Sequence, residues 1–302
     1  MSTETTSPFG TCLVAMVTPM KADGSLHLDD ARKLADHLVE SGCDGIVVNG
    51  TTGESSTLTT DESIEIIAVV ASHLAGRAKV VAGIGSNDTA HAVHLAKAAL
   101  DMGADAGLLV SPYYNKPTQR GLIAHCTAVA DATELPIMLY DIPGRTGIPY
   151  ATPTLLELAK HPQIMAVKDA KCDLWAATKV MAETDLAWYS GADEMNLALL
   201  ALGAVGVVSV VGHVAAGHYR AMVEAVSSGD LDRARTIHRA LVPLTEAIMN
   251  TSQGAIMAKA AMAELGVISE PMVRMPLVTS DDADLAKLRS ALAATPAVSD
   301  LA

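Results

Sequence analysis

A regular alternation of short apolar runs with longer segments of helical period constrains the fold most. Eight such runs recur between residues 12 and 210, and each is followed by apolar residues at three- and four-residue spacing. We expect strands at 12–18, 45–49, 80–84, 107–110, 137–140, 165–168, 187–189 and 206–210. Helices are expected at 29–41, 61–74, 89–102, 119–132, 153–160, 174–182, 193–202 and 215–227. Eight strand–helix units in a row predict an α/β fold, a closed parallel TIM (β/α)8 barrel.

An open, doubly wound sheet is the alternative fold. The expected strands are continuously apolar. This is typical of parallel strands that are covered on both faces, which both folds contain. However, TPMKADG follows the first strand, where a dinucleotide-binding sheet would carry GxGxxG. The GIG at Gly83–Gly85 lacks the third glycine of that motif. The pattern therefore favours the barrel.

The part of the chain beyond residue 230 loses the strands and keeps the helical period. Helices are expected at 230–250, 255–265 and 281–294. We therefore predict two domains, a catalytic barrel over 1–229 and a three-helix domain over 230–302.

Composition excludes several classes of function. The chain has 21 Lys and Arg against 34 Asp and Glu, a net charge of −13, which disfavours binding to nucleic acid or to an anionic membrane. No apolar run is long enough to span a membrane. Four widely spaced cysteines without a CxxC pair argue against a disulfide scaffold. The N-terminal MSTETTSPFG has neither signal-peptide nor transit-peptide character, so we expect a cytoplasmic protein.

The strongest candidate for a reactive group is Lys168. Active sites of such barrels lie at the C-terminal ends of the strands, and Lys168 ends the sixth expected strand. Desolvation in the barrel mouth would lower the pKa of its amine and make it a nucleophile. The alternative is a strand-end lysine that extends into solvent.

Two further candidates follow the fifth expected strand. Tyr140 ends that strand and would face Lys168, where it can transfer protons; otherwise it is a structural tyrosine of the barrel rim. Arg145 lies in a loop containing Pro143 and Gly147, where its guanidinium suits a carboxylate; a salt bridge that holds the loop is the alternative.

Two other loops carry polar side chains. NGTTGES at Asn49–Ser55 can present backbone N–H groups and threonine hydroxyls to an anion, or form a polar turn. SPYYNKPTQ at Ser111–Gln119 has paired tyrosines and is either a structural turn or an oligomer contact.

His213 is the one histidine well placed at the rim, and without a metal-binding motif we interpret it as a hydrogen-bonded loop residue. Glycines near the last two strands are interpreted as packing residues, so we expect no phosphate cofactor.

Taken together, these motifs resemble the dihydrodipicolinate synthase family. The resemblance rests on GTTGES (50–55), SPYYNKPTQ (111–119), YDIPGRTG (140–147), VKDA (167–170), and YSGAD followed by GVVSV (206–210), in the family's order over nearly the whole chain. It implies a lyase of diaminopimelate and lysine biosynthesis. It also implies a homotetramer with a C-terminal helical domain, and neither metal nor organic cofactor.

The resemblance also implies a role for each site residue. Lys168 would form a Schiff base with pyruvate. Tyr140 and Thr52 would pass protons together with Tyr114, which a neighbouring subunit contributes. Thr51 and Thr52 would hold the pyruvate carboxylate, and Arg145 the carboxylate of the second substrate, L-aspartate 4-semialdehyde. Gly191 and Val208 would line the site through backbone groups.

The chain departs from the family pattern at a few positions. Ser63 and His91 stand where lysine-inhibited members carry a histidine and a glutamate, so we do not expect lysine inhibition. Cys172 replaces a glycine of many relatives, and nothing in the sequence explains it. A sugar-acid or N-acetylneuraminate aldolase and a non-catalytic barrel that binds keto acids remain as alternatives. Arg145 argues against the first, and the retained lysine and tyrosines argue against the second.

Overall fold

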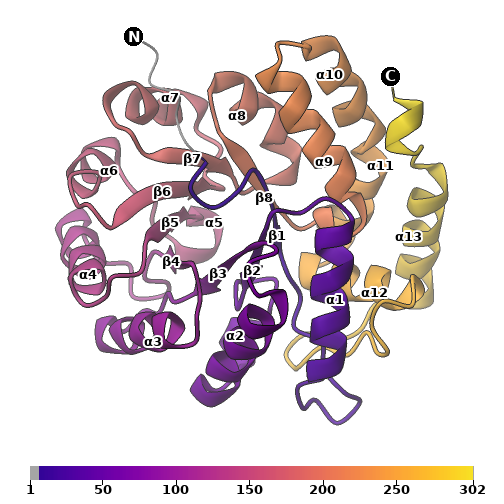
Figure 1. Cartoon of the computed structure of the whole chain (residues 1–302), viewed down its shortest axis with the longest axis horizontal. Coiled ribbons are helices and arrows are strands. Elements are labelled where there is room, and N and C mark those ends of the chain that lie inside the picture. Colours follow the sequence, from indigo (N-terminus) through magenta and orange to yellow (C-terminus); the bar gives the residue numbers. More distant parts are fainter. Residues whose placement is uncertain (1–6, 302) are drawn as a thin grey trace.

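Eight parallel strands close into a barrel in sequence order in the computed structural model, which describes residues 7–301 (Figure 1). The strands are β1 (Cys12–Ala15), β2 (Gly45–Val48), β3 (Lys79–Gly83), β4 (Ala106–Val110), β5 (Ile137–Asp141), β6 (Ile164–Asp169), β7 (Ala187–Ser190) and β8 (Gly206–Ser209). Pairing of β1 with β8 closes the barrel. The predicted barrel is therefore confirmed, and an open sheet is excluded.

Helices follow the strands along the chain, and most of them surround the barrel (Figure 1). They are α1 (Leu28–Glu40), α2 (Thr60–Leu74), α3 (Thr89–Asp101), α4 (Gln119–Asp131), α5 (Pro143–Thr146), α6 (Thr152–Leu158), α7 (Leu174–Glu183), α8 (Asn196–Leu202) and α9 (Gly212–Ser227), with short 3-10 turns η1 (Ser55–Thr57) and η2 (Asp193–Met195). Side-chain caps explain several starts: Thr59 and Glu62 form a reciprocal capping box on α2, and Asp88 caps α3. Each predicted barrel helix is present to within a few residues, whereas α5 was not predicted.

Two separate apolar clusters hold the barrel. The inner cluster fills the lumen with side chains that include Leu13, Val47, Tyr140, Tyr189 and Val208. The larger cluster lies between the strands and the surrounding helices. Along each strand, side chains belong alternately to the inner and to the larger cluster, because successive side chains point to opposite faces of a sheet.

The C-terminal part packs beside α9 (Figure 1). It contains α10 (Leu231–Ala240), α11 (Val242–Thr245), the π-helical η3 (Glu246–Asn250), α12 (Gly254–Glu264), α13 (Asp282–Ala294) and the short η4 (Val298–Asp300). The continuous helix predicted at 230–250 is thus wrong. Pro243 lacks a backbone N–H and stands in the first turn of α11, so the chain restarts its helix there. The domain boundary at 229/230 stays a prediction.

Two further observations concern residues 7–301. None of the helices there has the length and apolarity needed to cross a membrane. The four thiols are free; Cys12, Cys43 and Cys126 are buried, and Cys172 is exposed.

Candidate active site

Lys168 lies inside the C-terminal mouth of the barrel and does not extend into solvent. It is in register with Tyr140 on β5 and Tyr189 on β7, both of which belong to the inner cluster. Only 4% of Lys168 is exposed. Burial lowers the pKa of its amine to about 8, opposed by the negative charge of Asp193 and assisted by the positive charge of Arg145. A lysine with this pKa has a much larger fraction of free amine at neutral pH than an ordinary lysine.

Tyr140 lies directly against this lysine. The Lys168 Nζ is 4.2 Å from the centroid of the Tyr140 ring. Burial raises the pKa of Tyr140 to about 12, although the Arg145 charge and a hydrogen bond with the Thr51 side chain oppose the rise. The tyrosine therefore stays protonated at neutral pH and has a hydroxyl partner through which a proton can pass.

The loop of residues 49–55 presents its two threonines differently. The backbone N–H of Gly53 donates to the Gly50 carbonyl at 3.0 Å, and that of Glu54 donates to the Thr51 carbonyl at 3.1 Å. This turn places Thr51 on the wall of a cavity and beside Tyr140. Thr52 is buried and is not among the residues that line the cavity. The structure therefore brings Thr51, rather than Thr52, to the tyrosine.

Arg145 is carried by the one-turn helix α5. Pro143 stands at the start of this helix, and Gly147 ends it at φ 79°, a left-handed conformation that favours glycine. The Thr146 hydroxyl donates to the carbonyl oxygens of Ile142 and Ile148 at 3.1 and 3.0 Å. This rigid turn holds Arg145 at the wall of the cavity.

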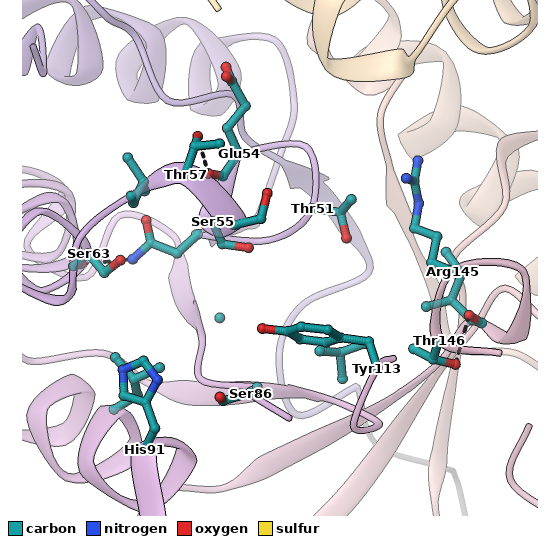
Figure 2. Close-up of a pocket in the computed structure, with 18 of the residues that line it drawn as sticks. Thr51, Glu54, Ser55, Thr57, Ser63, Ser86, His91, Tyr113, Arg145 and Thr146 are labelled. Atoms are coloured by element: carbon teal, nitrogen blue, oxygen red, sulfur yellow. Dashed lines mark hydrogen bonds between the residues drawn. The ribbon is translucent and has the colours of Figure 1, made fainter. Parts of the chain in front are cut away.

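The cavity has a volume of about 390 Å³. Figure 2 shows Thr51 and Arg145 on one side of the Tyr113 ring. Ser63, Ser86 and His91 lie on the other side, beyond the tyrosine hydroxyl. Two of the three departures that the resemblance implies, Ser63 and His91, are thus cavity residues.

The paired tyrosines point to different surroundings. Tyr113 lines the cavity, whereas Tyr114 has a left-handed backbone at φ 72° and is 90% exposed. A side chain so exposed is available to a second subunit, but it does not complete the site of its own chain. Its predicted role across an interface stays a prediction.

Gly191 follows β7 and adjoins the lysine, whereas Val208 lies on β8. Val208 is buried in the lumen within the inner cluster. The backbone N–H of Gly191 donates to the Asp169 carbonyl at 2.8 Å. A Cβ on Gly191 would lie 2.7 Å from the Cγ and 2.8 Å from the Cε of Lys168. Only glycine leaves room for the lysine side chain.

Gly191→Ala is therefore expected to push Lys168 from its position. We expect the rate at which pyruvate and borohydride label the protein to fall about tenfold, because small displacements of a reacting group are costly. Mass spectrometry of the reduced adduct measures this rate. Gly144→Ala is the matched control, because a Cβ there meets no atom within 4 Å. Equal labelling of the Gly191→Ala variant and the unaltered protein would contradict the steric role.

Asp193 is a candidate functional residue that the sequence interpretation missed. Its carboxylate accepts hydrogen bonds from the Val210 and Val211 backbone at 2.9 and 3.1 Å and from the Ser209 hydroxyl. It is buried, and its charge raises the pKa of Lys168. Its place directly after β7, in YSGAD, was the signal that could have identified it.

His213 is held by hydrogen bonds, but it lies at the start of α9 and not in a loop. Its Nε2 accepts from the Val17 backbone at 3.1 Å, and its Nδ1 is 2.8 Å from the Val210 carbonyl. Burial lowers its pKa to about 4. Within residues 7–301, no three His, Cys, Asp or Glu side chains are grouped so as to hold a metal ion.

Cys172 has a left-handed backbone at φ 63°. That conformation fits the expectation that relatives place a glycine there, since glycine adopts it without strain. The structure gives no role for its thiol.

Comparison with known proteins agrees with this geometry. The model of the dihydrodipicolinate synthetase family matches residues 8–295. The chain is 52% identical over 286 residues to 4-hydroxy-tetrahydrodipicolinate synthase of Kineococcus radiotolerans, covering 95% of this chain and 93% of that one. It is also similar to the enzyme from Cyanidioschyzon merolae with lysine bound, at 42% identity, TM-score 0.91 and coverage of 95% and 98%. The enzyme from Acinetobacter baumannii complexed with pyruvate matches at 37% identity, TM-score 0.91 and coverage of 95% and 99%. The chain belongs to the dihydrodipicolinate synthetase family.

Proposed function

We propose that this protein is a 4-hydroxy-tetrahydrodipicolinate synthase, a lyase that condenses pyruvate with L-aspartate 4-semialdehyde in diaminopimelate and lysine biosynthesis. The observation that carries the proposal is the buried amine of Lys168, with its pKa lowered to about 8, against the Tyr140 ring. The synthase activity of relatives about 50% identical supports the choice of reaction.

In the proposed first step the neutral amine of Lys168 attacks the keto carbon of pyruvate, and water leaves to give an imine. The protonated imine withdraws electrons from the adjacent methyl group. Loss of a methyl proton then gives an enamine, whose carbon attacks the aldehyde of the semialdehyde. The amine of the product closes a ring by displacing Lys168, which regenerates the free lysine.

Hydroxyl groups move the protons in these steps. We assign the relay to Tyr140 and Thr51, because the Thr51 side chain lies near enough to the tyrosine to lower its pKa. Thr51 and Thr52 both stay candidates for holding the pyruvate carboxylate. Tyr114 would join the relay from a neighbouring subunit of a homotetramer. Its 90% exposure, with 70% for Trp175 on α7, supports such contacts between subunits.

The acceptor distinguishes this reaction from the aldolase alternatives. Arg145 offers two parallel N–H donors at the cavity wall, which suit the carboxylate of the semialdehyde. We further propose that the enzyme acts in the cytoplasm without a cofactor.

Consumption of pyruvate in the presence of each acceptor tests the proposal. We expect rapid consumption with L-aspartate 4-semialdehyde and none with N-acetylmannosamine. Consumption with N-acetylmannosamine alone would show a sugar-acid aldolase. A protein that pyruvate and borohydride do not label would be a keto-acid-binding barrel only.

The pH dependence of imine formation follows from the pKa of Lys168. Below that pKa, about 8, the free-amine fraction falls roughly tenfold per pH unit. The borohydride-trapping rate at subsaturating pyruvate should therefore rise with pH and level off above the pKa. Asp193→Asn removes a charge that raises this pKa, so the inflection should move to lower pH. An inflection that stays in place would contradict the electrostatic role of Asp193.

A further inference from the structure

A buried ion pair joins the C-terminal helices to the loop that carries Thr51. The Lys259 Nζ on α12 donates to the Glu54 Oε1, and both side chains are almost completely buried. Lys259 also donates to the Met272 carbonyl at 2.6 Å, and the other Glu54 oxygen accepts from the Arg274 backbone N–H at 2.8 Å. The carboxylate and the ammonium therefore both have further hydrogen-bonding partners within the protein.

The loop at Glu54 has a backbone conformation that the surrounding structure must impose. Glu54 adopts φ 56° and ψ 35°, which side chains other than glycine rarely occupy. Its backbone N–H donates to the Thr51 carbonyl at 3.1 Å, and its carbonyl accepts from the Thr57 N–H at 2.9 Å. A shift of Glu54 therefore moves Thr51 directly.

Glu54 is among the residues that line the cavity, but its carboxylate pairs with Lys259. Figure 2 shows the carboxylate directed away from the Tyr113 ring, toward the C-terminal helices. Arg274 adds a second tether, because its guanidinium donates to the Thr57 carbonyl at 2.7 Å and pairs with Glu62. The segment after α12 thus holds both the loop and the start of α2.

Stability alone does not account for such a pair. Burying two charges costs solvation, and an apolar pair of similar volume is often equally stable. A buried pair does fix one geometry for the groups that carry it. Since Glu54 lies three residues from Thr51, the fixed geometry is that of the hydroxyl beside Tyr140.

We propose that Lys259 is a positioning residue of the synthase: through Glu54 it sets the 49–55 loop so that Thr51 meets Tyr140 and the pyruvate site. This inference rests on the proposed function. It predicts that breaking the pair weakens the use of pyruvate while leaving the Lys168 amine reactive, since Lys168 lies on β6 and not on the loop.

Borohydride trapping across a range of pyruvate concentrations tests this role. Glu54→Gln keeps the volume of the side chain and removes its charge, and burial favours the neutral amine of Lys259 because it lowers the pKa. We therefore expect the variant to fold. We expect its half-saturating pyruvate concentration to rise about tenfold, as for a displaced binding group, while the labelled fraction at saturation stays complete.

Lys259→Met and the double variant Lys259→Met/Glu54→Gln should show the same rise. If Lys259→Met does not fold because it leaves the Glu54 carboxylate unpaired, the double variant replaces it. Glu264→Gln on the same helix is the matched control, because it breaks an ion pair with Arg289 on α13 and should leave pyruvate use unchanged.

A double-mutant cycle with Thr51→Val shows whether Glu54 acts through Thr51. If it does, the two effects on half-saturation are strongly non-additive. Folded variants whose half-saturating pyruvate concentration stays within about twofold of that of the unaltered protein would overturn the proposal. Additive effects in the double-mutant cycle would also overturn it, as would an equal rise in Glu264→Gln. Failure of pyruvate to label the unaltered protein would instead refute the proposed function.

Discussion

Replacement of Lys168 by alanine is expected to lower pyruvate consumption with L-aspartate 4-semialdehyde by about 10⁴-fold or more, because the covalent path is lost with the nucleophile. The residual rate would come from binding and the remaining hydroxyls. Pyruvate and borohydride should add one reduced pyruvyl group to the unaltered protein and none to the variant. Intact-mass spectrometry before and after reduction measures both.

The position of Lys168 sets it apart from the other lysines. It is 4% exposed, with its pKa lowered to about 8, whereas Lys179 on α7 is exposed. At pH 7 an ordinary lysine is almost wholly protonated and does not attack a ketone. Lys179→Ala is therefore the matched control and should keep full labelling. Labelling that persists in Lys168→Ala, or that disappears in Lys179→Ala, would contradict the assignment.

Periodicity in the sequence was sufficient to predict the barrel. Strands covered on both faces read as continuous apolar runs, and the helices between them have one apolar face, so the two alternate visibly. Boundaries were less exact where local contacts decide them. The first strand was predicted to reach Thr18 but ends at Ala15. The helix α5 has only four residues, too few for any period to appear.

Residues of the site were predictable where a strand end places them. Lys168 and Tyr140 come together because β5 and β6 pair in register. The choice between Thr51 and Thr52 depended on a turn whose hydrogen bonds the sequence does not reveal. The Lys259–Glu54 pair joins residues 205 positions apart. In the sequence Lys259 is not distinguishable from the other residues of its helix. Only folding brings it to the loop.

Replacement of Arg145 by alanine is the second large effect that we expect. Arg145 lines the same cavity as Thr51, on a helix turn fixed by Pro143 and Gly147. Loss of a guanidinium that binds a carboxylate through two hydrogen bonds should lower kcat/KM for the semialdehyde by about 10²- to 10³-fold. Arg145→Lys keeps the charge without the planar fork, so it should recover only part of this loss.

The same arginine also acts on Lys168, and this second effect has to be separated from the first. Its positive charge lowers the pKa of the lysine, so Arg145→Ala raises that pKa and slows imine formation near neutral pH. Measurement well above pH 8 restores the free amine in both proteins and leaves acceptor recognition as the difference. There we expect the half-saturating pyruvate concentration for borohydride trapping to stay nearly unchanged while kcat/KM for the semialdehyde remains low. Equal losses for both substrates at high pH would show that Arg145 shapes the whole site and does not select the acceptor.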